Sequence, residues 1–215
     1  MFSVPYRMDM AERRPRKQSV NRLTAGDWTA AALDAIARGG LAAVAVEPLA
    51  TRLGATKGSF YWHFANRDAL IEAALQRWER DHTDAVIALV ETEPDPLAKL
   101  RTLIATVIES TASPHADAIE LAMLATAGHP HVAPVLARVT ERRVAYTAQL
   151  FEALGLPADE ARHRGLLAVS AYLGHAQLAH AAPQVVPGTA AQRQEYVDRI
   201  IGLLTGPPEN VGGSG

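Results

Sequence analysis

The apolar positions of this chain recur at helical spacing, beginning with the segment 25–39. Trp28, Ala32 and Ile36 stand four residues apart there, so their side chains fall on one face of a helix. Gly40 follows the last apolar position and is typical of a helix end. The pattern predicts an amphipathic helix whose apolar face packs into a core.

A second, shorter helix is predicted from about 46 to 53. Val46 and Leu49 stand three residues apart and share one face of it. Pro48 is compatible with this helix because it falls in the first turn, where its missing N–H group would have no partner in any case. Gly54 ends the helix, and a third helix is predicted to begin shortly after it.

The rest of the chain continues the helical pattern, interrupted by proline and glycine. Strand-type alternation of any length does not occur in the sequence, and neither does a repeat of fixed period. The sequence therefore predicts an all-α protein of about nine helices. Six of them follow the first three, at about 67–91, 96–111, 115–127, 131–154, 158–181 and 189–204.

Composition narrows the class of protein further. With 215 residues, of which 48% are hydrophobic and 20% charged, the chain can bury a core as one large or two small domains. It contains no cysteine, which excludes disulfides, thiolate catalysis and cysteine-bound metals. The longest apolar stretch, 166–182, contains His175 and His180 and is short for a bilayer, so it predicts a buried helix. Residues 1–22 have no continuous apolar core, so we expect no signal peptide and a cytoplasmic location.

Charge is distributed unevenly along the chain. Residues 1–67 hold ten Lys and Arg against five Asp and Glu, a net charge of +5. Residues 68–82 carry −2 and residues 83–215 carry −5, which gives the overall net charge of −2. This asymmetry favours contact between the N-terminal part and a polyanion such as DNA.

The third helix combines an apolar face with an aromatic, polar face. On a helical wheel, Phe60 and Phe64 fall together and can anchor the helix on the first two. Ser59, Trp62 and His63 fall opposite, with Tyr61 on the flank. Two short helices joined by a glycine-containing turn are typical of a helix-turn-helix.

Two interpretations of the exposed aromatic residues remain open on geometry alone. Tyr61, Trp62 and His63 could contact DNA, where Tyr and His bind phosphate oxygens and Trp packs on sugars or a thymine methyl group. Thr56, Lys57 and the N–H groups that follow would then attract a phosphate to the start of the helix. Alternatively, the three aromatic side chains pack against the next helix.

Residues from about 27 to 72 resemble the DNA-binding domain of the TetR family of regulators. The motifs that carry this resemblance are Gly40, Leu49-Ala50, Gly54, Lys57-Gly58, Tyr61-Trp62-His63-Phe64 and Arg67-x-x-Leu70. The chain departs from the family pattern at Ala45, where a Ser or Thr usually caps the second helix; the missing cap costs about 1 kcal/mol. It also has Arg67 where the family usually has a lysine that touches phosphate, a role that arginine can keep.

The resemblance implies a ligand-responsive regulator, usually a repressor, that binds a palindromic operator as a homodimer and is released by a small molecule. It divides the chain into a basic arm at 1–22, a helix-turn-helix domain at 23–68, a ligand-binding and dimerisation domain at 69–206 and a flexible tail at 207–215. The arm either reaches DNA or is a solvated tail. The implied contacts to bases or groove edges come from Lys57, Gly58, Ser59 and Tyr61, and those to the DNA backbone from Thr56, Trp62, His63 and Arg67.

The last two helices are the dimer candidates that the resemblance implies. One face of the eighth helix carries small and apolar residues, and the ninth carries a second apolar stripe. The first stripe consists of Leu166, Val169, Ser170, Leu173, Gly174, Gln177 and Leu178, and the second of Tyr196, Ile200, Leu203 and Leu204. Packing of both faces within one chain is the alternative.

A largely apolar effector pocket is expected among the central helices. Side chains at helical spacing that could reach it are Trp78, Ile104, Ile108, Met123, Tyr146 and His175, although core packing explains such residues more often. His129 and His131 lack neighbouring ligand residues at metal-site spacing, so neither a metal nor another cofactor is predicted. An all-α enzyme or small-molecule carrier is the competing function. The sequence lacks a nucleophile–base set, a phosphate loop or a dinucleotide fingerprint to support an enzyme.

Overall fold

The computed structural model describes residues 23–112 and 118–206, and every regular element within these ranges is helical. A π-helical turn, Arg80–Asp84, joins α4 and α5 into one continuous helix, so the described ranges contain the nine predicted helices, and the all-α prediction is confirmed. The predicted arm at 1–22 and tail at 207–215 lie outside these ranges. The helices are α1 (Ala25–Gly39), α2 (Val46–Arg52), α3 (Lys57–Tyr61), α4 (Arg67–Glu79), α5 (Ala85–Val90), α6 (Pro96–Ser110), α7 (Ala118–Ala125), α8 (Ala133–Ala153), α9 (Ala158–Ala181) and α10 (Ala190–Thr205).

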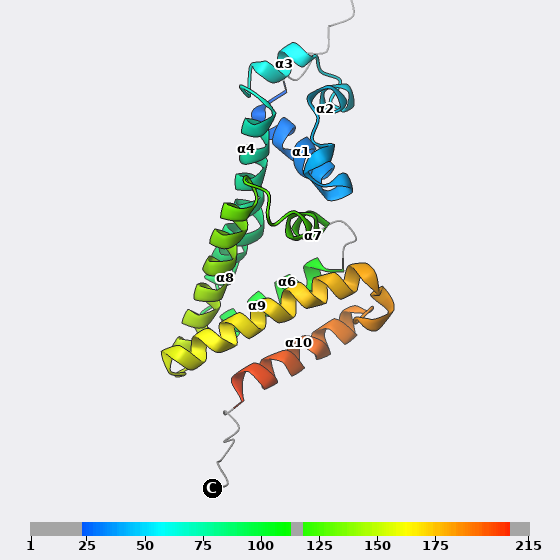
Figure 1. Cartoon of the computed structure of the whole chain (residues 1–215). Coiled ribbons are helices and arrows are strands. Elements are labelled where there is room, and N and C mark those ends of the chain that lie inside the picture. The colour runs from blue at the N-terminus through cyan, green and yellow to red at the C-terminus, as the bar shows by residue number, and fades with distance from the viewer. Residues whose placement is uncertain (1–22, 113–117, 207–215) are drawn as a thin grey trace, which may run out of the picture.

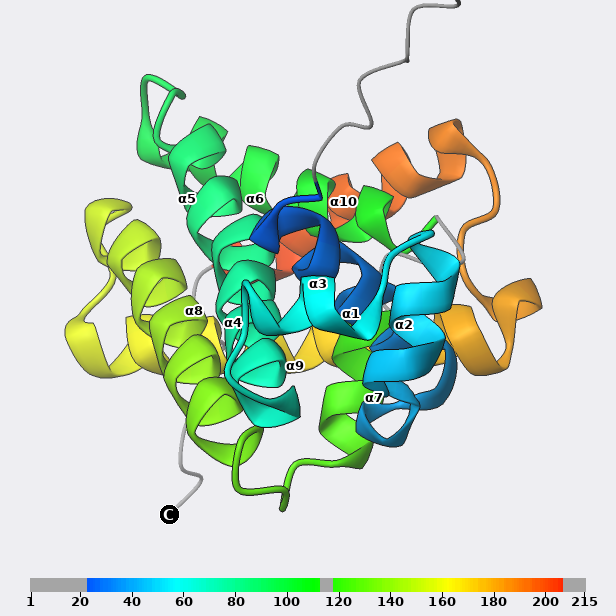
Figure 2. The ribbon, with the colours of Figure 1, turned by 90° about the horizontal axis from the view of Figure 1, so that it is seen from above.

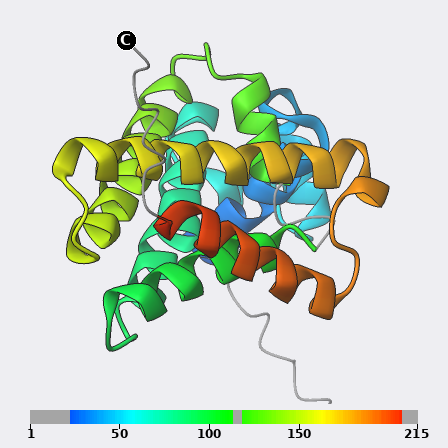
Figure 3. The same ribbon diagram turned by 90° about the horizontal axis from the view of Figure 1, so that it is seen from below.

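The helices are arranged in two levels that α4 connects (Figure 1). Helices α1, α2 and α3 lie together at one end of the molecule, and α9 and α10 lie at the other. Seen from above, α3 and α1 lie over the middle of the molecule, with α4 and α8 side by side next to them (Figure 2). The view from below shows α9 and α10 together on the opposite surface (Figure 3).

Local sequence signals set most helix boundaries at the N-terminal end. The Thr24 hydroxyl accepts a hydrogen bond from the Asp27 N–H group, and the Asp27 carboxylate accepts one from the Thr24 N–H group, which forms a capping box on α1. Gly40 ends α1 with φ 66°, a conformation that disfavours residues with a Cβ atom. Ala45 precedes α2 and gives it no side-chain cap, as the sequence predicts.

The first hydrophobic core crosses the boundary that the sequence predicts at residue 68. Trp28 and Ile36 of α1 and Trp78 of α4 are fully buried in one cluster, to which Met123 of α7 and Leu136 of α8 also belong. The first three helices thus share their core with the central helices, which fixes the N-terminal unit on the rest of the chain.

A second core lies lower in the molecule and holds α8 against α9. Their backbones approach closely at Gly165, where a Cβ atom would lie 2.8 Å from the Val144 carbonyl oxygen. Phe151 of α8 and Ala161 of α9 are fully buried beside this crossing. None of the described helices is both long and apolar enough to cross a membrane.

Candidate nucleic-acid interface and ligand cavity

Two phenylalanines anchor α3 on the rest of the N-terminal unit. Phe60 is fully buried and meets the Trp28 ring edge-on, with 5.4 Å between ring centroids. Phe64 is also buried and stacks on Phe60 at 5.7 Å. Aromatic pairs of this geometry add to the free energy of apolar burial, so the inner face of α3 is fixed on the core, as the wheel predicts.

The opposite side of α3 presents aromatic side chains to solvent. Tyr61 is 54% exposed and Trp62 is 81% exposed, so neither packs against the following helix. His63 and Ser59 are half-buried. Large exposed aromatic side chains on a five-residue helix are unfavourable in water unless a partner covers them. This aromatic surface is open to a binding partner.

The start of α3 is held in place by a side-chain cap. The Thr56 hydroxyl accepts a hydrogen bond from the Ser59 N–H group at 3.2 Å. Gly58 is exposed at the same end of the helix, and a Cβ atom there would approach nothing closer than 3.7 Å. A partner can therefore come close to the backbone at this point.

An ion pair links α3 to α2. The Lys57 ammonium lies 2.8 Å from the Glu47 carboxylate, and both side chains are largely exposed. Their hydrogen bond lowers the pKa of Glu47 and raises the pKa of Lys57, so both groups are charged at neutral pH. Helical spacing within either helix does not predict this pair. The contact orients Lys57 along the same surface as Tyr61, while an exposed pair of this kind contributes little stability.

Arg67 makes two backbone contacts that the sequence does not predict. Its Nε donates to the Val44 carbonyl oxygen and its Nη2 to the Leu41 carbonyl oxygen, both at 2.6 Å. The guanidinium group therefore ties the start of α4 to the connection between α1 and α2. In this structure Arg67 positions the N-terminal unit, and the contact with DNA phosphate stays a prediction.

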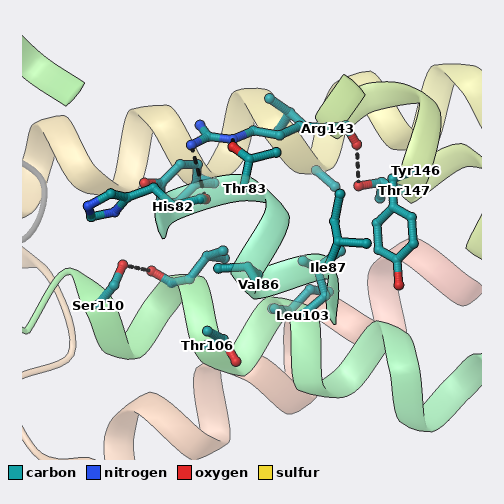
Figure 4. A pocket seen from close by; sticks show the side chains of 15 residues that line it. His82, Thr83, Val86, Ile87, Leu103, Thr106, Ser110, Arg143, Tyr146 and Thr147 are labelled. Atoms are coloured by element: carbon teal, nitrogen blue, oxygen red, sulfur yellow. Dashed lines mark hydrogen bonds between the residues drawn. The ribbon is translucent and has the colours of Figure 1, made fainter. Parts of the chain in front are cut away.

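A cavity of about 100 Å³ lies among the central helices, between the π-helical turn, α5, α6, α8 and α9 (Figure 4). Its walls are mainly aliphatic, with a few hydroxyl groups and one guanidinium group. The lining residues are His82, Thr83, Val86, Ile87, Leu103, Ile104, Thr106, Val107, Ser110, Arg143, Tyr146, Thr147, Ala168, Val169 and Tyr172. Such mainly apolar walls with a few polar groups are typical of small-molecule sites.

Only part of the cavity lining was predicted from the sequence. Ile104 and Tyr146 line it, whereas Trp78, Ile108, Met123 and His175 are not among its lining residues. Trp78 and Met123 belong to the upper core and Ile108 to the lower one. His175 is buried and stacks on Tyr196, with 5.3 Å between ring centroids. Core packing is thus what these four side chains do in the structure.

The ring of Tyr146 lines the cavity, but its hydroxyl group forms a hydrogen bond to a residue outside the lining. Its hydroxyl donates to the Glu91 carboxylate at 2.6 Å. Burial and this hydrogen bond raise the pKa of Tyr146 well above its ordinary value, so the phenol stays protonated at neutral pH. The ring therefore serves the cavity as an uncharged wall.

The dimer candidates on α9 and α10 divide into two groups. Leu166, Leu178 and Leu203 are exposed to solvent, and Leu203 is the most exposed of them at 82%. Val169 and Leu204 are buried within the chain instead. Each of these three leucines is exposed in the single chain.

His131, just before α8, lies near two carboxylates that the sequence does not place beside it. His131 Nδ1 lies 3.3 Å from Glu72 and Nε2 lies 3.8 Å from Asp68. Within residues 23–112 and 118–206, no group of three or more His, Asp and Glu side chains could hold a metal ion.

The sequence of the N-terminal unit is similar to that of a known protein family. Residues 29–74 match the family model described as "Bacterial regulatory proteins, tetR family". No curated protein sequence matches the chain.

Solved structures resemble nearly the whole described chain. A transcriptional regulator from Rhodococcus sp. Rha1 is 23% identical with a TM-score of 0.69, covering 85% of this chain and 96% of its own. A regulator from Pseudomonas aeruginosa PAO1 is 17% identical with a TM-score of 0.72, covering 88% and 97%. The Bacillus subtilis regulator FadR, solved in complex with stearoyl-CoA, is 13% identical with a TM-score of 0.66, covering 85% and 98%. At these identities, the likeness establishes the fold.

Proposed function

Residues 29–74 belong to the tetR family of bacterial regulatory proteins, and on that premise we propose that the chain is a transcriptional repressor that a small molecule releases from its operator. It binds a palindromic site as a homodimer and catalyses no reaction. It acts on chromosomal DNA and thus in the bacterial cytoplasm. In this proposal residues 23–68 bind DNA, and residues 69–206 bind the effector and form the dimer.

The observation that carries the proposal is the two-sided construction of α3. Phe60 is fully buried while Trp62, two residues later, is 81% exposed. An apolar side chain as large as Trp gains free energy when a partner covers it, at about 25 cal/mol per Å² of apolar surface. The width of the DNA major groove admits a helix that presents such a face.

The contacts with DNA follow from where each side chain lies. Tyr61 and Trp62 are exposed on the partner-facing side, next to Lys57 and the exposed backbone at Gly58. We assign Lys57, Gly58, Ser59 and Tyr61 to base or groove contacts, and Thr56, Trp62 and His63 to the DNA backbone. Arg67 supports this surface from behind through its two carbonyl contacts and is the weakest candidate for a phosphate contact.

Dimerisation is proposed through α9 and α10. Leu166, Leu178 and Leu203 are exposed, and the helices that carry them lie at the end of the molecule opposite α3 (Figures 1 and 3). A two-fold pair through this face would leave both α3 helices free to enter successive grooves of a palindromic site. The cavity below the N-terminal unit is the proposed effector site.

A mobility-shift assay against the DNA upstream of the chain's own gene tests the proposal. The intact chain should bind specifically, and Lys57→Ala and Tyr61→Ala should weaken binding because each removes a contact at the DNA surface. Lys99→Ala is the control, since Lys99 also pairs with a glutamate, Glu91, at 2.6 Å, but on α6. Equal binding by all three variants and the intact chain would contradict the assigned surface.

A further inference from the structure

The cavity contains one arginine, and its charge is compensated by a buried carboxylate. Arg143 Nη1 lies 2.5 Å from Glu120 Oε1, and both side chains are largely buried. The Tyr172 hydroxyl donates to the other Glu120 oxygen at 2.9 Å. The carboxylate therefore has a partner on each oxygen, and the pair is satisfied without a ligand.

Arg143 is also fixed in orientation. Its Nε donates to the Thr83 hydroxyl at 3.2 Å, in the π-helical turn. The guanidinium carbon lies 5.5 Å from the centre of the Trp78 ring and 5.7 Å from that of the Tyr172 ring. Cation–π contacts on two rings hold the guanidinium plane in place. Swinging out to meet a ligand would break all of these contacts.

Two further titratable groups in the lining, His82 and Tyr146, add no charge at neutral pH. Burial lowers the pKa of His82, whose ring stacks on Trp78, so the imidazole is neutral. Tyr146 stays protonated because burial and its bond to Glu91 raise its pKa. The walls thus carry no uncompensated charge that could balance a charged ligand.

A charged molecule would be strongly disfavoured in such a cavity. Moving an ionised group from water into apolar surroundings without a new partner is costly, and Arg143 already has one. An uncharged molecule loses far less, because its single polar group can bond to hydroxyls in the lining. Thr106 and Ser110 supply such hydroxyls from α6, and they lie on the wall across the cavity from Arg143 (Figure 4).

Volume limits the size of this molecule. The cavity holds about 100 Å³, which is somewhat less than the ~150 Å³ of an engineered apolar cavity that binds benzene. The part of a ligand that it encloses is therefore about one six-membered ring, given small shifts of the aliphatic walls.

We propose that the effector is an uncharged, mainly apolar molecule of single-ring size with one hydrogen-bonding group, and that the Arg143–Glu120 pair excludes organic anions of the same shape. The effector role of this molecule rests on the proposed function, but its binding to the cavity does not depend on DNA. The compensating Glu120 carboxylate is the group that sets the preference for a neutral ligand.

Calorimetry on the DNA-free protein tests the proposal with benzamide and benzoate, which share a shape and differ in charge. Benzamide should bind more tightly than benzoate by about tenfold or more. Glu120→Gln keeps the shape of the pair but leaves Arg143 uncompensated, so benzoate should gain affinity and reverse the preference. Leu103→Trp should fill the cavity and abolish binding of both, whereas Leu97→Trp, on the exposed side of α6, should change neither.

The outcomes distinguish ligand charge, ligand size and the regulatory role. Equal or tighter binding of benzoate by the intact protein overturns the proposal, and so does an unchanged preference in a folded Glu120→Gln variant. Absence of binding by benzamide at millimolar concentration overturns the size class. If Glu120→Gln does not fold, the comparison in the intact protein and the Leu103→Trp variant still decide. The proposed function would fail in a different way: the chain would bind benzamide but would not bind the DNA upstream of its own gene.

Discussion

Replacing Arg67 with methionine distinguishes a positioning role from a phosphate contact. Methionine keeps the apolar stem and removes the guanidinium, which donates to the carbonyl oxygens of Val44 and Leu41 at 2.6 Å each. Hydrogen bonds from a charged donor contribute about 1.5–3 kcal/mol each. The Arg67 side chain is 39% exposed, so water can partly replace these bonds. We expect the free energy of unfolding to fall by about 2 kcal/mol in total.

Urea unfolding measures this loss, and DNA binding at several salt concentrations measures the other role. A side chain that neutralises one phosphate contributes about 0.9 to the slope of log affinity against log salt concentration. Lys57→Met, which removes a base or groove contact in the proposed assignment, should weaken operator binding with little loss of stability, because its ammonium group pairs with the exposed Glu47 carboxylate. Arg67→Met should lower affinity at all salt concentrations while the slope stays the same.

The opposite pattern would refute the positioning role. If Arg67→Met unfolds at the same urea concentration as the intact protein and loses about 0.9 of the salt slope, then Arg67 leaves its carbonyl partners to bind phosphate. Arg67→Lys separates the two cases further. A lysine can still meet a phosphate as a point charge, but it cannot donate to two carbonyls in the fixed geometry of the guanidinium fork.

Three further predictions concern the rest of the fold. Gly165→Ala should destabilise the protein by about 1–3 kcal/mol relative to the control Gly202→Ala. At Gly165 the new Cβ atom would lie 2.8 Å from a backbone oxygen of α8, whereas at Gly202 nothing lies within 4 Å. Equal melting temperatures of the two variants would contradict the close approach of α8 and α9. Leu203→Glu should shift the chain from dimer to monomer in sedimentation, because it charges the most exposed leucine of the proposed interface; an unchanged mass would exclude that interface. Burial lowers the pKa values of His82 and His175 below 6.5, so the unfolded state binds more protons than the folded state. The free energy of unfolding should therefore fall as pH falls through about 6.5, by up to ~1.4 kcal/mol per pH unit for each histidine. His175→Phe should make this pH dependence less steep in urea titrations, and an unchanged slope would contradict the role of His175.

The fold could be predicted because its signals are local. Apolar spacing and proline or glycine stops mark each helix, and they place the boundaries of α1 and α6 within a residue of the structure. The division of α3 was predictable for the same reason. Phe60 and Phe64 stand four apart in the sequence, and the Phe64 N–H group still donates to the Phe60 carbonyl oxygen although α3 ends at Tyr61. Both side chains therefore fall on the side that the wheel predicts to be buried, where two large apolar groups leave water.

Contacts between distant segments could not be read from the sequence. Arg67 reaches carbonyl groups 23 and 26 positions earlier in the chain, and a long side chain can do so in any direction that tertiary packing permits. Arg143 and Glu120 are likewise 23 positions apart and on different helices. Helical periodicity predicts that a residue faces inward, but it does not distinguish a wall of the cavity from a core position such as Met123.

The structure also changes what the charge asymmetry means. Within residues 23–67, four basic residues stand against three acidic ones. Arg38 and Arg52 both bind the Asp34 carboxylate, Lys57 binds Glu47, and Arg67 binds carbonyl groups. Residues 23–67 are therefore close to neutral in net charge. The proposal that they bind DNA is supported by their exposed aromatic side chains and by the shape of the unit, and not by its charge. Most of the N-terminal excess of positive charge belongs to residues 1–22, with six basic residues against two acidic ones.

Salt dependence can therefore decide between the two interpretations of the N-terminal arm. If the arm binds phosphates, replacing Arg13, Arg14, Arg16 and Lys17 with glutamine should lower the salt slope by about 0.9 for each phosphate that is no longer neutralised, up to roughly 3.6. If it is a solvated tail, the slope should not change, because the basic groups of the described unit are untouched. Binding to operator and to unrelated DNA should weaken by the same factor, since phosphate contacts carry no sequence information. Selective loss of operator binding would instead show that the arm reads the minor groove.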